Sequence, residues 1–311
     1  MTHQRLPRFL VLTLHCGENE IYDCKASVAR QHAVSVEHVV FSELGNIEAH
    51  HRLYQEIMTR ASEFDFFLKL DADMVISRDT ALSEVSWYLA AHPELDHFAV
   101  DVKDHFTGSC MPSVHTFSPR VKWHLSANQT LFVDPSPQIP GKRVLRSTDI
   151  APFVEHAPNP HPFQAFHFGV HRALKSVQPN QFFKSVDRMK EQIDVLNDLE
   201  RHYNATGRET LGLALMGATM VLRGEIHQAS GDKASTTVQA GFETVSRMTA
   251  ENIRREIAAS AGWRQQVYSR MLKTGQRWQS VRPFVTPVTR RLRTSLVELK
   301  KLHGMLMRSA K

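Results

Sequence analysis

One stretch decides the fold that this sequence predicts: Phe66-Phe67-Leu68-Lys69-Leu70-Asp71-Ala72-Asp73-Met74-Val75-Ile76. A mostly apolar run leads to two carboxylates spaced i, i+2, and apolar residues resume directly after them. Such a run is typical of a strand that is buried on both faces of a parallel sheet. Ligands of open α/β sheets bind at the carboxyl ends of the strands, so we expect Asp71 and Asp73 to face a ligand.

The residues before this stretch alternate between strand and helix patterns. Apolar runs predict strands, and apolar residues at helical spacing predict helices. The strands are expected at 9–14, 36–41 and 64–70, and the helices at 20–31 and 46–62. This β-α-β-α-β order implies a parallel sheet with right-handed crossovers. The first part of the chain is therefore expected to be an α/β domain.

The residues that follow extend this domain. We expect a helix at 79–91 and a strand at 97–102. Residues 103–150 suit a substrate-shaping insertion or an antiparallel edge, with short β pieces at 114–117, 120–124 and 130–133. A short strand within 152–162 and a helix at 163–176 complete the domain.

From residue 179 onward the pattern is helical throughout. Helices are expected at 181–203 and 208–226, one or more over 242–280, and a last basic helix at 288–308. The expected division is therefore an α/β domain at 1–177, a helical extension at 178–240 and a basic amphipathic helical tail at 241–311.

Residues 9–82 resemble the family 2 glycosyltransferases, whose nucleotide-sugar-binding domain has the GT-A fold. One part of the resemblance is FLVLTLHCGENEIYDCKASVARQ, in which Cys24, Ser27 and Gln31 stand at positions typical of the family. The other is LKLDADMVISRDTAL, which is similar to the metal-binding DxD segment. The resemblance implies a GT-A fold, an α/β Rossmann-like and mostly parallel sheet with flanking helices, followed here by an all-helical C-terminal region.

The resemblance also implies the reaction. A metal-dependent enzyme would move a sugar from a nucleotide-sugar donor, expected to be a UDP-sugar, to a glycan or lipid-linked acceptor in cell-surface polysaccharide synthesis. Asp71 and Asp73 would hold Mn²⁺ or Mg²⁺ on the diphosphate, since such cations take oxygen ligands and share them with phosphates. His156 and His167 are the candidates for a further metal ligand.

Other residues are assigned by their place in the expected elements. Thr13, Glu18 and Glu43 lie at the ends of the first two strands and are candidates for the nucleotide pocket, although the Asp-rich turn common in the family is missing around Glu43. Arg172 and Lys175 are cationic candidates for the diphosphate or for an anionic acceptor.

An inverting enzyme needs a general base for the acceptor hydroxyl. The family's Glu-Asp pair before a late helix is not found in this sequence. Asp149 and Glu155 are the nearest carboxylates in position, and Asp101 and Asp104 end the fourth strand. The base and the stereochemistry stay open among these four.

Two other functions fit parts of the sequence. Asp71-Ala72-Asp73-Met74-Val75 satisfies the pattern of haloacid-dehalogenase-like phosphatases, in which Asp71 would be the nucleophile. In that family the motif closes the first strand, whereas about sixty residues precede it here. A non-catalytic protein that binds a membrane surface is the other alternative.

The end of the chain is strongly basic. Residues 247–311 hold 15 Lys and Arg against 3 Asp and Glu, which leaves 23 and 29 of the chain's 38 and 32 for the rest. A basic amphipathic helix with aromatic residues suits an anionic membrane surface. No nucleic-acid-reading motif accompanies it, so no nucleic acid is expected. A packed appendage or a contact between copies of the chain, a homo-oligomer, is the alternative.

Composition sets the expected compartment. No apolar run reaches membrane-spanning length, no signal peptide is apparent, and three cysteines lack metal-ligand spacing. We therefore expect a cytoplasmic protein that binds peripherally to the inner face of the membrane.

Overall fold

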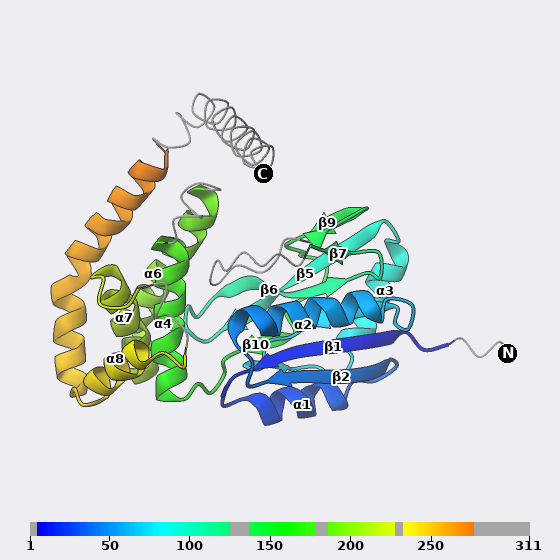
Figure 1. Ribbon diagram of the computed structural model, residues 1–311, viewed down its shortest axis with the longest axis horizontal. Coiled ribbons are helices and arrows are strands. Elements are labelled where there is room, and N and C mark those ends of the chain that lie inside the picture. Colours follow the sequence, from blue (N-terminus) through cyan, green and yellow to red (C-terminus); the bar gives the residue numbers. More distant parts are fainter. Residues whose placement is uncertain (1–4, 125–136, 178–185, 228–232, 277–311) are drawn as a thin grey trace, which may run out of the picture.

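The computed structural model describes residues 5–124, 137–177, 186–227 and 233–276. An α/β body with helices on both faces of a curled sheet lies beside a body made of helices (Figure 1). The expected α/β architecture followed by a helical region is thereby confirmed. The strand expected at 130–133 and the helix expected at 288–308 lie outside the described residues.

The main sheet has the strand order β2-β1-β3-β6-β5-β10-β4, and β9 pairs with β5 beside this path. Its strands are β1 (Arg8–His15), β2 (Ser35–Ser42), β3 (Phe66–Lys69), β4 (Met74–Ile76), β5 (Leu95–Asp104), β6 (Cys110–Phe117), β9 (Lys142–Val144) and β10 (Val154–His156). β4 and β6 run antiparallel to their neighbours, and the other pairings are parallel. β7 (Lys122–Trp123) and β8 (Pro137–Gln138) form a separate small sheet.

The helices divide between the two bodies. Those on the sheet are α1 (Ile21–Ala29), α2 (Asn46–Thr59) and α3 (Ala81–Ala91). Those beside it are α4 (Pro162–Val177), α6 (Val186–Thr206), α7 (Glu209–Leu222), α8 (Thr236–Ser246) and a helix at 250–276.

β1 shows why the sheet needs cover on both faces. Phe9 and Val11 are fully buried on the face covered by α1 and α3, and Leu10 and Leu12 are fully buried on the face covered by α2. Side chains alternate between the faces of a strand, so a continuous apolar run stabilises a sheet only when both faces are covered.

β6 departs from the sequence expectation. It lies in the middle of the sheet, between β3 and β5, and not at an edge. A tight connection after β5 returns the chain alongside it, and the free edge of β3 then accepts β6 as a second neighbour. Sequence spacing predicts the hairpin partner of a strand but not its neighbour on the other side.

β4 explains how the DxD segment is positioned. After β3 the chain crosses to the far end of the strand order, where β4 pairs with β10. The sheet curls, so that Met74 and Ile76 pack in one cluster with Cys24 and Val28 of α1. Asp71 and Asp73 therefore lie in a link that is held at both ends.

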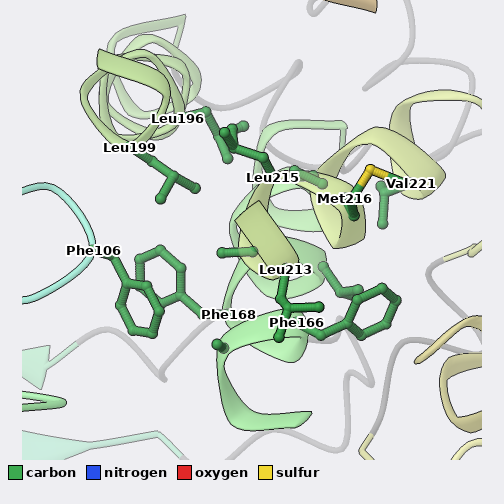
Figure 2. Packing of buried hydrophobic residues seen from close by; sticks show 14 of the residues in the cluster. Phe106, Phe166, Phe168, Leu196, Leu199, Leu213, Leu215, Met216 and Val221 are labelled. Carbon is green, nitrogen blue, oxygen red and sulfur yellow. The ribbon is translucent and has the colours of Figure 1, made fainter. Parts of the chain in front are cut away.

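The helical body is joined to the sheet by aromatic packing. Phe106, from the β5–β6 connection, stacks on Phe168 of α4 with ring centroids 3.8 Å apart. Figure 2 shows both rings facing leucines of α6 and α7, among them Leu199 and Leu213, in one buried cluster. Burying two aromatic rings against this cluster contributes several kcal/mol, at about 25 cal/mol per Å² of apolar surface.

The described part of the basic segment packs on the same cluster. The helix at 250–276 buries Ile253, Ile257, Tyr268 and Met271 against α6 and α7. Among the described residues, no helix combines the length and apolarity that crossing a membrane requires.

Glycines set the distance between α4 and α7. A Cβ at Gly169 would lie 1.7 Å from the Ala214 carbonyl oxygen, and one at Gly217 would lie 2.2 Å from the Phe166 carbonyl oxygen. Both obstacles are backbone atoms, so no side-chain rotation relieves them. The two helices can approach this closely only because both positions lack a side chain.

We expect Gly169→Ala to destabilise the protein by at least about 2 kcal/mol, because α4 and α7 must separate to admit the methyl group. Gly262→Ala is the control, since its Cβ meets nothing within 4 Å in the helix at 250–276. It should stabilise by up to about 1 kcal/mol. Urea denaturation measures both, and equal effects would contradict this account of the packing.

Candidate active site

A cleft of about 410 Å³ opens where the carboxyl ends of β1, β2 and β3 meet α4. Its floor includes Asp71 and Asp73, its wall is one face of α4, and residues from the start of β6 close another side. In open α/β sheets this edge is where ligands bind.

The DxD segment is tethered to α1 and the residues just after it by three side chains that the sequence resemblance had singled out. Ser27 Oγ accepts a hydrogen bond from the Ile76 amide at 3.0 Å. Gln31 donates to the Arg78 carbonyl at 2.9 Å and accepts from the Leu82 amide at 3.0 Å. Cys24 Sγ lies 3.9 Å from the Asp71 carbonyl oxygen. α1 thus holds the backbone on which both aspartates stand.

Behind the DxD segment, a histidine lies between two carboxylates. His156 and Asp104 are cross-strand partners at the ends of β10 and β5. Asp104 Oδ1 accepts from His156 Nδ1 at 2.5 Å, and Asp104 Oδ2 accepts from the Thr107 amide and hydroxyl at 2.7 Å each. His156 Nε2 lies 3.4 Å from Asp73 Oδ2. The imidazole is therefore fixed in orientation and aimed at Asp73.

This arrangement shifts the pKa values of all three groups. Burial alone would lower the pKa of His156, but the carboxylates of Asp73 and Asp104 outweigh it and raise that pKa to about 10. Burial would raise the pKa of Asp104, yet its bonds to His156 and Thr107 hold that pKa at about 2. The pKa of Asp73 is likewise below its usual value despite burial, because the His156 charge lies beside it.

The residues fit a hard divalent cation in part. Asp73 Oδ1 is buried and has no hydrogen-bond partner among the described residues. Asp71 and the Nε2 atom of His156 supply further donors on the same side of the cleft. A carboxylate behind a ligand histidine, as Asp104 is here, fixes its tautomer and strengthens it as a ligand. Binding a cation would displace the proton from Nε2.

The donor set is not complete by itself. In the part of the chain that the structure describes, no group of three His, Cys, Asp or Glu side chains forms a ready-made metal site. Mg²⁺ and similar ions often take only one or two carboxylates from the protein and the rest from water and phosphate oxygens. The geometry therefore suits a cation that arrives with a phosphate ligand.

Cations surround these carboxylates. Lys69 Nζ lies 3.8 Å from Asp71 Oδ1, and Lys233 Nζ forms an ion pair with Glu18 Oε1. Lys233 also lies 3.5 Å from the Cys16 carbonyl oxygen. Lys233, which lies just before α8, therefore contacts the β1–α1 loop.

Arg172 has a different environment. Its guanidinium lies over the Phe168 ring, 5.0 Å from the centroid, and donates to Gln192 Oε1 at 3.4 Å. Burial lowers its pKa, and the nearby carboxylates of Asp104, Asp73 and Asp71 oppose that shift. None of the described carboxylates forms an ion pair with it, and its buried Nε has no hydrogen-bond partner among the described residues.

The structure brings seven of the candidate site residues to the cleft. They are Glu18, Asp71, Asp73, His156, His167, Arg172 and Lys175. His167 lies on α4 with its ring parallel to that of His171, the centroids 6.2 Å apart. Asp104 is buried directly behind His156. The roles of these residues stay predictions.

Besides Asp104, five candidates do not line the cleft. Thr13 is buried in the sheet, where its hydroxyl bonds His38 Nε2 at 2.9 Å. Glu43 and Glu155 are exposed. Asp101 pairs with Arg146 at 3.0 Å, and Asp149 accepts a hydrogen bond from the Tyr88 hydroxyl at 2.8 Å. None of the four carboxylates offered as a general base therefore faces the cleft.

Sequence reasoning missed two contributors. Lys233 has no motif around it, and Phe106 is one aromatic residue in a turn-rich segment. Both reach the cleft only because the helical body packs against the strand ends. No signal in the sequence could have found them.

Comparisons with known proteins identify no family for this chain. No protein-family model matches the chain, and no curated protein sequence matches it. Two solved structures that are similar to it are both glycosyltransferases. One is involved in the glycosylation of the major capsid of PBCV-1, with 19% identity over 36% of this chain and a TM-score of 0.27; the chain spans 60% of its length.

The other is the mannosyltransferase PcManGT from Pyrobaculum calidifontis, in complex with GDP-Man and Mn²⁺. It shows 12% identity over 88% of this chain and 87% of that one, with a TM-score of 0.38. Similarity at this level carries no argument about the activity of this chain.

We expect Asp104→Asn to destabilise the protein by about 3 kcal/mol, because it leaves a buried imidazolium with a weaker partner. Asp101→Asn is the control on the same strand, and it should cost less than about 1 kcal/mol because Arg146 is exposed. In urea denaturation, the double variant with His156→Gln should lose less than the two single losses added together. Additive losses would show that the two residues do not act as a pair.

Proposed function

We propose that this protein is a metal-dependent glycosyltransferase that uses a nucleotide-sugar donor. The observation that carries the proposal is the Asp73–His156–Asp104 arrangement in the lining of a cleft at the carboxyl ends of parallel strands, where Asp73 keeps a buried carboxylate oxygen that has no hydrogen-bond partner among the described residues. Burying a carboxylate oxygen costs free energy unless the oxygen accepts a hydrogen bond or binds a cation.

The donor would lie across the ends of the first three strands. Leu14 and Phe41, at the ends of β1 and β2, supply apolar surface for a nucleoside, and His50 of α2 lies on the same side of the cleft. The diphosphate would then lie over the β3–β4 link, beside Asp71 and Asp73. A UDP-sugar is the donor we propose for testing first.

The residues around the β3–β4 link each have a distinct task in this proposal. Asp73 and His156 would hold Mn²⁺ or Mg²⁺, and Asp71 would bind it directly or through water. Asp104 keeps the Nδ1 proton of His156 in place, so that Nε2 is the atom that faces the cation. The bound cation would stabilise the negative charge that develops on the leaving diphosphate.

Cationic side chains would add to that stabilisation. Lys69 lies beside Asp71 and Arg172 lines the same cleft, and both are held by neighbouring groups before any ligand binds. Preorganised positive charge at a leaving group lowers the barrier without reorganisation during the reaction. For the acceptor we propose only a broad class, a glycan or a lipid-linked acceptor.

Membrane association is a separate proposal. Arg254, Arg255, Arg270 and Lys273 are exposed on the helix at 250–276, on the side away from its buried apolar residues. Such a face suits an anionic membrane surface. Residues 277–311, which carry much of the basic charge, lie outside the described residues.

We expect Mn²⁺ together with a nucleoside diphosphate to raise the melting temperature of this protein more than either does alone. Asp73→Asn should abolish the joint effect, because it removes the carboxylate that meets both the cation and His156. Asp194→Asn, an exposed aspartate of α6, is the matched control and should behave like the wild type.

A panel of nucleotide sugars with Mn²⁺, followed by release of the nucleotide, then identifies the donor. Hydrolysis of an aryl phosphate that is lost in Asp71→Asn, with no response to any nucleotide, would favour the phosphatase reading and refute the proposal.

A further inference from the structure

A buried network of hydrogen bonds joins two segments that line the cleft. One is the β1–α1 loop, which contributes Cys16 and Glu18 to the lining. The other is the segment 157–164, which connects β10 to the first turn of α4 and contributes Gln164. At the centre of the network lie Glu20, 1% exposed, and Gln164, 5% exposed. The network, which we call the loop clamp, consists of Asn19, Glu20, Asn159 and Gln164.

The bonds of the loop clamp all cross between the two segments. Glu20 Oε1 accepts from the Asn159 amide at 3.0 Å, and Glu20 Oε2 accepts from Gln164 Nε2 at 3.0 Å. Gln164 Oε1 in turn accepts from the Asn19 amide at 3.1 Å. Asn19 Nδ2 donates to the Asn159 carbonyl oxygen at 2.8 Å. Each segment therefore donates a backbone amide to a side chain of the other.

The order of donors and acceptors requires one carboxylate and one amide at the centre of the clamp. Both ends of the chain of bonds are backbone N–H groups, from Asn159 and Asn19, and an N–H can only donate. Two central amides would leave two donors facing each other, whichever way the amides are turned. Two central carboxylates would leave two acceptors facing each other. Only the present combination of Glu20 with Gln164, or its reverse, satisfies every group.

Burial makes this requirement strict. Because Glu20 and Gln164 are almost inaccessible to solvent, water cannot replace a bond that is lost between them. Burial raises the pKa of Glu20, and its hydrogen bonds with Gln164 and Asn159 oppose that rise. Both oxygens of Glu20 accept hydrogen bonds, which is the pattern that suits the ionised carboxylate.

His161 adds a second tie between the same segments. Its Nδ1 accepts from the Gln164 amide at 3.2 Å, so the ring proton is on Nε2 and is donated to the Gly17 carbonyl oxygen at 3.2 Å. Gln164 is thereby held through its backbone as well as through its side chain.

The segment 157–164 also holds the DxD segment. The Ala157 amide donates to the Asp73 carbonyl oxygen at 2.6 Å. One end of this segment therefore contacts Asp73, and the other end contacts the β1–α1 loop through the loop clamp. The spacing between Glu18 and Asp73, on two sides of the cleft, depends on both contacts.

We propose that Glu20 is a positioning residue of this enzyme, which fixes the β1–α1 loop against the DxD side of the cleft through Gln164 and Asn159. Glu20 does not line the cleft, so it would act through these partners and would not touch the donor. When both segments are ordered in advance, less of the binding free energy is lost in ordering them. The inference rests on the proposed glycosyltransferase function.

The test measures the binding of Mn²⁺ together with the nucleoside diphosphate that gives the largest thermal shift, by calorimetric titration of the full chain. Glu20→Gln should weaken this joint binding about tenfold, because two donors then face each other within the clamp and the segments lose their fixed spacing. Gln164→Glu should also weaken it, because two carboxylates then face each other.

The double variant Glu20→Gln with Gln164→Glu reverses the two central groups and keeps every hydrogen bond of the clamp. The amide at position 20 accepts from the Asn159 amide and donates to the carboxylate at position 164, which accepts from the Asn19 amide. The affinity should return to within about threefold of the wild type, although each single substitution lowers it. Hydrogen exchange of the Asn19 and Asn159 amides should speed up in each single variant and slow again in the double variant.

Asp96→Asn is the matched control. Asp96 is a buried carboxylate at the start of β5, away from the cleft, and accepts from Arg120 Nε at 2.7 Å and from the Gly141 amide at 2.6 Å. Its substitution should lower the melting temperature and change the joint affinity less than twofold, because it disturbs a buried carboxylate that does not hold the cleft.

The outcomes separate the two proposals. If Glu20→Gln lowers the melting temperature but binds like the wild type, the clamp only stabilises the fold and the inference fails. It also fails if the double variant binds no better than the single variants. The glycosyltransferase proposal stands in both cases. Should one single variant not fold, the other single variant and the double variant decide by the same criteria. If the wild type binds no nucleoside diphosphate with Mn²⁺, the glycosyltransferase proposal falls, and this inference falls with it.

Discussion

The antiparallel pairing of β4 with β10 is the constraint on which the candidate site depends. It sets His156 against Met74 in register, and thereby brings the imidazole to Asp73. The parallel pairing of β10 with β5 then places Asp104 behind the same imidazole. Three ionisable groups thus meet in the interior because β4, β10 and β5 pair in one fixed register. The charges are stable in the interior because each attracts an opposite charge beside it, and this attraction offsets the free-energy cost of removing the charges from water.

The support around this pairing is polar on one side and apolar on the other. Ser27 of α1 and Gln31, just after that helix, satisfy backbone groups of Ile76 in β4 and of Arg78 and Leu82 beyond it. Phe106 and Phe168 close the other side by stacking. Polar and apolar contacts together keep the carboxylates of the link in place when no cation is bound. The free-energy cost of ordering them when a cation binds is therefore lower.

The close contact of α4 with α7 has a consequence for the chemistry of the cleft. Because Gly169 and Gly217 let the helices approach at backbone distance, α4 is fixed as a rigid wall. Its polar face then presents Arg172 and Lys175 to the strand ends, and its apolar face joins the helical core. The cleft and the helical core therefore meet opposite faces of one helix, as its amphipathic sequence requires.

The sequence by itself determined the strands and helices of the first half and the place of the DxD segment. Apolar run lengths and helical spacing are local properties, and they decided β1, β2, β3 and the helices between them. The apolar run also marked Asp71 and Asp73 as candidates for a ligand site, and the family resemblance added His156. Only the tertiary structure decided which residues accompany them. Strand order placed β6 inside the sheet, helix packing brought Lys233 to the cleft, and Asp101, Asp149 and Glu155 were left outside it. These outcomes depend on contacts between segments far apart in the chain, and no local pattern encodes such contacts.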